Sequence, residues 1–152
     1  MRSIDAVLEQ LDEVVEALSA VDLDVLAAPQ RFAVLERLET ARRRQVAVSC
    51  AVVSRLERFE GCPPLPITLA DVLRISKREA NRRLRDAKQL TPRTTLTGQS
   101  LPPLLPETAK AWHAGMLDGE HLQVIEKFFR DLPDHVPAAE IEKAEKSLAE
   151  PR

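Results

Sequence analysis

Aromatic residues are scarce in this sequence of 152 residues: they make up 3% of it, and tyrosine is absent. Glycine occurs only four times. A β-sandwich relies on aromatic strand residues and on glycine-bearing turns, so this composition argues against one. The hydrophobic content is nevertheless 44%. That is enough to form a core of Leu, Val and Ala, in a chain whose length is that of one domain or part of one.

Cysteine is also rare, with two residues in the chain. Cys50 lies in an apolar run, where a small buried thiol is the expected role. Cys62 follows Gly61 at an expected helix end, and two such cysteines do not indicate a disulfide framework. An acidic amphipathic run follows Arg2 in place of a signal-peptide core, and no run reaches the roughly 18 apolar residues of a membrane span. We therefore expect a cytoplasmic protein with no membrane partner.

Motifs for catalysis and cofactor binding are lacking too. The sequence has no P-loop, no GxGxxG, no nucleophile elbow and no carboxylate pair with a supporting partner. His113, His121 and His135 do not have metal-ligand spacing. His121 falls at the third position of an expected helix, where a satisfied structural histidine is the simpler interpretation. We expect no catalytic residue, no metal, no cofactor and no small-molecule substrate.

The charge is unevenly distributed, although the net charge is only −2. Residues 1–30 carry seven acidic side chains and one basic one, residues 31–90 carry seven acidic and fourteen basic ones, and the remainder is acidic again. Such a basic centre is either a binding face or a face that the acidic ends shield.

Apolar periodicity predicts two helices in the N-terminal part. Ser3 is the expected N-cap of the first, which runs to about Ala20. Pro29 suits the first turn of a long helix, Gln30 to Glu60, that Gly61 ends. The expected buried residues are Ile4, Leu8, Leu11, Val15 and Leu18 in the first helix, and Phe32, Leu35, Leu38, Val46, Val53, Leu56 and Phe59 in the second. The run Arg42 to Arg44 is a solvated face or a phosphate contact.

Three further helices are predicted near the C-terminus. The first begins at Pro106, closes at Gly115 and buries Trp112; Asp118 caps the second; Pro137 opens the third. Their expected apolar residues are Ala109, Leu122, Ile125, Phe128, Phe129, Ile141, Ala144 and Leu148. The charged residues Glu140, Glu142, Lys143, Glu145 and Lys146 are expected to form a solvated face.

The segment between these two groups predicts two short helices joined by a tight turn. Thr68 is the expected N-cap of the first, with Asp71 three residues later. Ser76 and Glu79 fit a capping box, in which each side chain satisfies a free backbone donor of a second helix, Lys77 to about Leu90. This order is that of a helix-turn-helix. Arg74 stands where such turns often carry glycine, which puts a tight left-handed turn in doubt.

The second of these helices has an apolar stripe, Ala80, Leu84 and Ala87, beside a cationic arc. The arc is the candidate nucleic-acid-binding site, made of Lys77, Arg78, Asn81, Arg82, Arg85 and Lys88. Two interpretations stay open: contact with double-stranded DNA or RNA, or a solvated face that could meet an acidic partner or a second copy of the chain.

The predicted fold class is therefore all-α, a multi-helix bundle of about seven helices with a central helix-turn-helix-like unit. We expect four parts of one domain or domain fragment. Residues 1–61 hold the first amphipathic helix and the long helix, residues 62–90 the basic helix-turn-helix-like unit, residues 91–105 a loop rich in Pro and Thr, and residues 106–152 the C-terminal helices.

The order of these parts resembles the N-terminal part of the actinobacterial 13E12-repeat proteins, the domain of unknown function numbered 222. The resemblance rests on Leu69-Ala-Asp-Val-Leu-Arg-Ile-Ser-Lys-Arg-Glu-Ala-Asn-Arg-Arg-Leu84, on Leu105-Pro-Glu-Thr-Ala109, on Ala114-Gly-Met-Leu-Asp-Gly-Glu-His121 and on Leu132-Pro133. Members of that family are commonly longer, and many end in an HNH nuclease domain. The resemblance implies a DNA-related setting more than an activity.

The sequence departs from the longer members in lacking the HNH ligand set. Its single asparagine, Asn81, lies in the basic helix, and its histidines have no metal-ligand spacing. We therefore expect a non-catalytic DNA-binding or targeting domain, from a fragment or a truncated family member. The alternative is a helical interaction or dimerisation module with a basic face.

Overall fold

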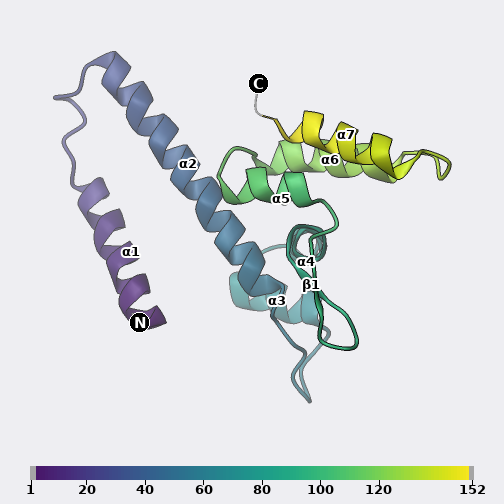
Figure 1. Cartoon of the computed structure of the whole chain (residues 1–152). Helices are drawn as coiled ribbons and strands as arrows, with labels where there is room; N and C mark the ends of the chain where they lie inside the picture. The colour runs from purple at the N-terminus through teal and green to yellow at the C-terminus, as the bar shows by residue number, and fades with distance from the viewer. Residues whose placement is uncertain (1–2, 151–152) are drawn as a thin grey trace. The chain divides into compact units, whose positions relative to one another are not determined.

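The structure is a computed structural model that describes residues 3–150. Its described residues form seven α-helices and two short strands (Figure 1), so the all-α prediction is confirmed. The helices are α1 (Ile4–Ser19), α2 (Ala28–Val53), α3 (Leu65–Leu73), α4 (Lys77–Leu90), α5 (Pro106–His113), α6 (Gly119–Arg130) and α7 (Ala138–Ala149), and the strands are β1 (Arg93–Thr94) and β2 (Ser100–Leu101). The chain divides into an N-terminal unit, Met1–Leu38, and a C-terminal unit, Glu39–Arg152.

Helix α1 begins where the sequence predicted. The Ser3 side chain accepts a hydrogen bond from the backbone N–H of Ala6 at 3.2 Å. The predicted buried stripe is wrong, because no residue of α1, all of which the structure describes, is buried, and Ile4 is 68% exposed. Apolar periodicity identifies which face of a helix is apolar, but not whether another element packs against that face. The rest of the N-terminal unit consists of a connector and the first turns of α2, and these segments bury no residue of α1.

Helix α2 ends at Val53, seven residues before the predicted end. The Ser54 hydroxyl and the Arg55 guanidinium donate to the carbonyl of Ala51, at 2.7 and 2.8 Å. The Ser54 hydroxyl bond is of the kind that competes with backbone hydrogen bonding, and it lies directly after the last residue of α2. Gly61 does adopt a left-handed φ of 81°, but in the connector after the helix.

The predicted core of the long helix, Gln30 to Glu60, is also mostly wrong. Of the seven expected residues only Val53 is buried, whereas Phe32 and Phe59 are 73% and 72% exposed. Ala47 and Cys50 join Val53 in the core, at a spacing of three that places all three on one face. Cys50 is buried as predicted, and both cysteines are free thiols.

The core of the C-terminal unit gathers residues from α2 to α7. Helix α3 packs on α4, and α5 packs on both α4 and α7, which also contacts α6. Trp112 is buried as predicted and is part of this core. The other buried apolar residues of α3–α7 and their connections are Leu69, Ala80, Ala87, Leu90, Ala109, Ala111, Leu117, Leu122, Ile125 and Ala149.

The predicted loop over residues 91–105 contains the β1–β2 hairpin. Its strands are antiparallel, with Arg93 opposite Leu101 and Thr94 opposite Ser100. Thr95 and Gly98 shape the tip, where Gly98 has a φ of 83° that glycine adopts freely. The backbone N–H groups of Leu104 and Leu105 donate to the carbonyl of Gln89, which fixes the return of the chain beside α4.

One predicted surface acid of α7 is buried. Glu145 is 4% exposed, and its Oε1 accepts a hydrogen bond from the backbone N–H of Thr108 at 2.8 Å. Helix α5 starts at Pro106 without a side-chain cap of its own. Glu145 therefore satisfies one of the free donors of the α5 N-terminus from another helix, and the predicted solvated face is wrong at this position.

Candidate nucleic-acid interface

Helix α3 starts three residues before the predicted cap, at Leu65, with Pro64 at the N-cap position. The prolines at 64 and 66 suit a first turn, because the amide hydrogens they lack would have no helical partner there. Thr68 thus lies inside the helix, and its hydroxyl donates to the carbonyl of Pro63 at 3.2 Å. The prediction of Thr68 as N-cap is wrong for this reason.

The turn between α3 and α4 is the tight left-handed turn that Arg74 put in doubt. Arg74 adopts φ 54° and ψ 43°, and its backbone N–H bonds the carbonyls of Ala70 and Asp71. The N–H of Ile75 also donates to Ala70, at 3.0 Å. These bonds close the C-terminus of α3 in the way a glycine usually does, at the cost of a left-handed non-glycine residue.

Helix α4 has the predicted bounds, Lys77–Leu90. The Ser76 hydroxyl accepts from the N–H of Glu79 at 3.1 Å, which is half of the predicted capping box. The Glu79 carboxylate serves a different purpose from the predicted one, because it accepts hydrogen bonds from Arg82 and Arg83. Ala80 and Ala87 are buried and Leu84 is half-buried, so the apolar stripe of α4 is confirmed.

Five of the six candidate contact residues are exposed along α4. They are Lys77, Arg78, Asn81, Arg85 and Lys88, and they form what we call the basic face. The Asn81 amide donates to the carbonyl of Lys77 at 2.9 Å. Because the opposite side of α4 is anchored in the core, the basic face is held at the surface of the C-terminal unit.

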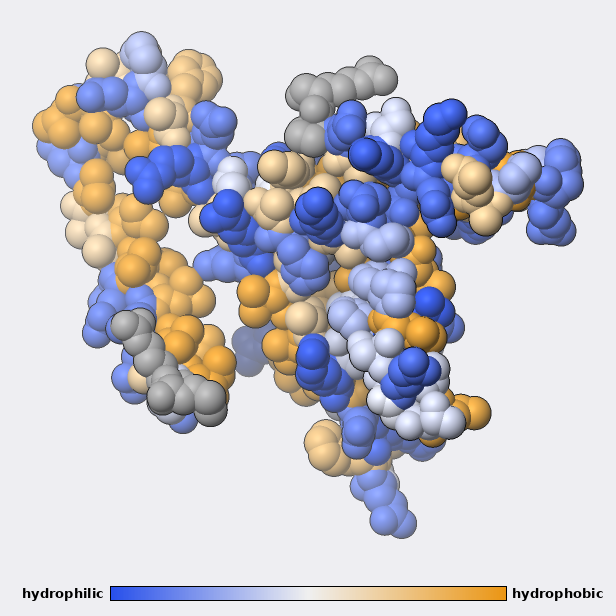
Figure 2. All heavy atoms as spheres, in the orientation of Figure 1, coloured by the Kyte–Doolittle hydropathy of each residue, from blue (hydrophilic) through white to orange (hydrophobic). Residues whose placement is uncertain are grey.

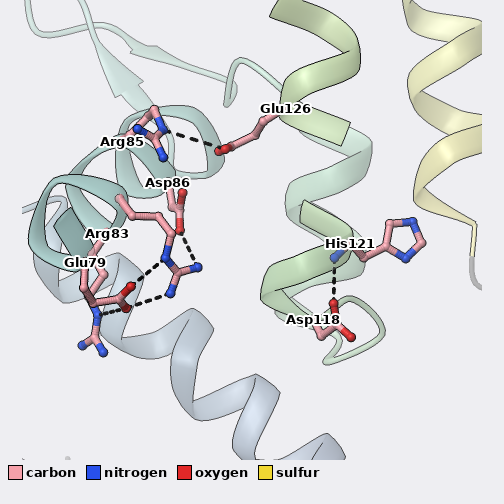
Figure 3. Close-up of polar contacts among 8 residues, drawn as sticks. Glu79, Arg83, Arg85, Asp86, Asp118, His121 and Glu126 are labelled. Atoms are coloured by element: carbon pink, nitrogen blue, oxygen red, sulfur yellow. Dashed lines mark hydrogen bonds and ion pairs between the residues drawn. The ribbon is translucent and has the colours of Figure 1, made fainter. Parts of the chain in front are cut away.

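Arg82, the sixth candidate, is turned toward acidic residues. Its side chain is 27% exposed, and Nε and Nη2 donate to the two carboxylate oxygens of Glu79 at 2.8 and 2.7 Å. Arg83 Nε donates to the same carboxylate at 2.9 Å (Figure 3). The hydrogen bond from Arg82, with that from Arg83, lowers the pKa of Glu79 to about 2. Glu79 thus fixes both arginines along the side of α4.

A buried acid pair lies between α4 and α6. Asp86 is 5% exposed and Glu126 9%. Asp86 Oδ2 is 3.7 Å from Arg82 Nη1, and Glu126 Oε2 is 3.8 Å from Arg85 Nε. Burial, and then the charge of Glu126, raises the pKa of Asp86 to about 7. This pair was not predicted, because its members are far apart in the sequence. The only signal in the sequence was an acid beside the apolar stripe of each helix.

A cleft of about 470 Å³ opens beside this cluster, between α2, α4, α5 and the segment that begins α6. Charged side chains of α2 and α4 line it together with Trp112 and Cys50. Burial, and then the charge of Asp86, raises the pKa of Cys50 to about 11, so the thiol is neutral and a poor nucleophile at neutral pH.

The arginine run of α2 is engaged within the protein. Arg42 and Arg43 pair with Glu39, at 2.6 and 3.2 Å. Arg44 Nε donates to the carbonyl of Ala114 at 3.1 Å and so ties α2 to the end of α5. The backbone approaches closely there, because a Cβ on Gly115, whose φ is 77°, would lie 2.9 Å from the Thr40 carbonyl.

The histidines add no metal site to this picture. His121 Nε2 lies 3.1 Å from the carbonyl of Leu148, and the N–H of His121 bonds the capping Asp118 at 2.7 Å. The satisfied-histidine interpretation is confirmed. Among residues 3–150, no three His, Cys, Asp or Glu side chains are grouped as metal ligands would be. In the same range, no helix has the length and apolar character that crossing a membrane requires.

Comparison with known proteins identifies relatives but no activity. A family model described as "Domain of unknown function (DUF222)" matches residues 32–152. The chain is 43% identical over 148 residues to "Uncharacterized protein Rv1702cMb1728c" of Mycobacterium tuberculosis (strain ATCC 25618 / H37Rv), a match covering 95% of the chain and 33% of the relative. It is 40% identical over 154 residues to "Uncharacterized protein Rv1128c" of that strain, covering 95% and 34%.

A third relative, "Uncharacterized protein Mb1179c" of Mycobacterium bovis (strain ATCC BAA-935 / AF2122/97), is 36% identical over 153 residues, covering 97% of the chain and 33% of the relative. The chain thus spans about a third of the length of these curated relatives. No solved structure matches it significantly. Neither the family description nor the relatives' names indicate a catalytic family.

Proposed function

This chain belongs to the family described as a domain of unknown function, DUF222, and from that premise and the geometry of α3 and α4 we propose that it is a DNA-binding or targeting domain that uses α4 on double-stranded DNA. The observation that carries the proposal is the basic face: four cations and one amide exposed on a helix whose other side is buried. A short helix, a tight turn and such a helix is the arrangement by which helix-turn-helix proteins enter the major groove.

Within this proposal the residues of the basic face divide by position. Lys77, Arg78 and Asn81 lie at the N-terminal end of α4, which faces base edges in such complexes. Arg85 and Lys88 lie further along, where contact with phosphates is expected. Arg82 is left out of the contact set, because Glu79 and Asp86 already hold its guanidinium.

The wider setting of the proposal comes from the resemblance to 13E12-repeat proteins. In that setting the chain is the targeting part of a mobile-element-type, HNH-associated protein, and it performs no catalytic step itself. The DNA-contacting residues would then position a nuclease elsewhere in a longer protein.

The experiment is a fluorescence-anisotropy titration of the whole chain with labelled double-stranded DNA at two salt concentrations. Phosphate contacts make log affinity fall linearly with log salt, with a slope of about 0.9 per contact. Lys88→Ala should weaken binding to all sequences and lower that slope by about one. Lys143→Ala is the matched control, because Lys143 is an exposed lysine on α7.

Two outcomes would overturn the proposal. One is the absence of DNA binding at low salt. The other is an equal loss of affinity in Lys88→Ala and Lys143→Ala, which would indicate attraction by net charge and not by the basic face.

A second candidate function is a helical interaction or dimerisation module. The exposed apolar stripe of α1 favours it, with Ile4, Leu8 and Val15 at least half exposed; Figure 2 shows apolar surface along the helices of the N-terminal unit. A protein interface would saturate against one partner and depend weakly on salt. Sedimentation of the chain over a range of concentrations tests self-association directly.

A further inference from the structure

The acid pair, Asp86 on α4 and Glu126 on α6, is buried next to the basic face. Each side chain has one oxygen, Asp86 Oδ1 and Glu126 Oε1, that is buried and has no hydrogen-bond partner within the described chain. The other oxygens face arginines, Arg82 and Arg85, at 3.7 and 3.8 Å. Figure 3 shows Arg85 directed from α4 to Glu126 on α6. Arg85, one of the proposed DNA-contacting residues, therefore lies against the acid pair.

Two neighbouring buried carboxyl groups resist being ionised together, because each charge is poorly solvated and repels the other. Such a pair commonly retains one proton, which a hydrogen bond between the two groups accommodates. The charged and titratable groups that face Asp86 are Arg82 and Arg85 on its own helix, Glu126 on α6, and Cys50 on α2. Two guanidinium groups do not offset this repulsion fully, because both stand beyond hydrogen-bond distance.

We propose that the Asp86–Glu126 pair is a proton switch that regulates DNA binding by the basic face of α4. The inference rests on the proposed function. In the singly protonated state Asp86 donates to Glu126, the pair carries one negative charge, and Arg85 is free to reach a phosphate. On losing its proton to solvent the pair carries two negative charges and holds Arg82 and Arg85 against the protein.

The direction of the effect follows from this charge balance. Proton uptake adds one positive charge beside the DNA-facing side of α4 and releases Arg85, which is equivalent to about one further phosphate contact. DNA affinity should therefore rise severalfold, by up to about tenfold at 0.1 M salt, as the pH falls from 8.5 to 6. The burial of Asp86 and its neighbour Glu126 raise the pKa of Asp86 to about 7, which places the change within this interval.

The experiment measures two properties of the same full chain. The first is the ionisation of Asp and Glu side chains in the free protein, followed by carboxyl-carbon NMR between pH 4 and 9. The second is DNA affinity by anisotropy at pH 6 and pH 8.5, at constant ionic strength. The proteins are the parent chain, Asp86→Asn, Glu126→Gln and Glu142→Gln, of which the last removes an exposed acid of α7 as a control.

A shared proton predicts a carboxyl resonance that titrates near neutral pH in the parent chain and is absent in Asp86→Asn. Asp86→Asn should also keep the high affinity of the acidic form at both pH values, whereas Glu142→Gln should keep the parental pH dependence. The three histidines are present in every variant, so their contribution cancels in the comparison. Glu126→Gln should shift the pH dependence to lower pH, because Asp86 stays buried but loses its acidic neighbour. This second variant keeps the test decisive if Asp86→Asn does not fold.

Two results would overturn the inference: ordinary acidic titration of every carboxyl group, or an unchanged pH dependence of DNA affinity in both Asp86→Asn and Glu126→Gln. Failure of the proposed function looks different. In that case no variant binds DNA at either pH, while the NMR titration still shows whether the pair holds its proton.

Discussion

At the scale of single residues, Arg74 carries a conformational cost for the turn between α3 and α4. Its φ of 54° is the one positive value among the non-glycine residues that the structure describes. A left-handed conformation costs an L-residue about 1–2 kcal/mol. The turn persists because the bonds of residues 74 and 75 to α3, and the packing of α3 on α4, over-determine it.

Arg74→Gly should stabilise the protein by about 0.5–1 kcal/mol, because the relief of strain exceeds the larger backbone entropy of glycine in the unfolded chain. Urea unfolding measures the difference. Arg74→Ala is the control, since alanine keeps the strain and should give no gain. Equal stability of the glycine and alanine variants would contradict a strained turn.

Ser76 is the other residue that stabilises the α3–α4 segment through a local contact. Ser76→Ala removes the acceptor for the Glu79 N–H at the start of α4, and it should cost about 1 kcal/mol. The melting temperature should fall, while Ser147→Ala, at an exposed position of α7, should change stability by less than about 0.5 kcal/mol. A melting temperature that Ser76→Ala leaves unaltered would show that this cap contributes nothing.

At the scale of elements, the helices of the C-terminal unit complete one another's ends. Helix α5 has no capping side chain of its own, and α7 supplies one in Glu145. Likewise Arg44 of α2 reaches the carbonyl of Ala114 at the end of α5. Such contacts replace solvent at helix termini that packing has buried.

Glu145→Ala should destabilise the protein by about 1–3 kcal/mol, because it leaves the Thr108 N–H buried without an acceptor. Glu145→Gln keeps an acceptor oxygen and should cost less. Glu142→Ala, on the exposed side of the same helix, is the control. Chemical denaturation at neutral pH ranks the three, and equal costs at positions 142 and 145 would contradict the capping role.

At the scale of the whole molecule, the Asp86–Glu126 pair should affect stability as well as binding. Because the folded pKa of Asp86 lies above its unfolded value of 3.8, at about 7, the fold binds the proton more tightly than the unfolded chain does. The stability from this group is fully present below about pH 4 and is lost as the pH rises toward 7, by at most about 1.4 kcal/mol per pH unit.

Comparison of the parent chain with Asp86→Asn isolates this effect. The free energy of unfolding of the parent should fall relative to that of Asp86→Asn as the pH is raised from 4 to 7, and the difference should be constant above pH 8. Urea denaturation at several pH values measures it. A difference that does not vary with pH would mean that Asp86 ionises in the fold as it does in the unfolded chain.

The sequence by itself determined the features that depend on neighbours along the chain. Helix α4 has its predicted bounds, its Ser76 cap and its apolar stripe, because capping and the 3.6-residue period are local. The start of α5 and the Asp118 cap of α6 follow the same logic. Local rules failed where two of them competed, as when the prolines of residues 63–66 displaced the start of α3 from Thr68.

Only the tertiary structure decided which charged residues face solvent and which face one another. Arg78 and Arg82 share the predicted arc, yet Arg82 is held by Glu79 and Asp86 while Arg78 is exposed. Glu142 and Glu145 lie on the same helix, yet only Glu145 meets the end of α5. Asp86 and Glu126 are neighbours only because α4 and α6 belong to the same folded unit. The sequence determines which side chains can carry a charge. Their exposure to solvent and their partners depend on how the fold brings together segments that are far apart in the chain.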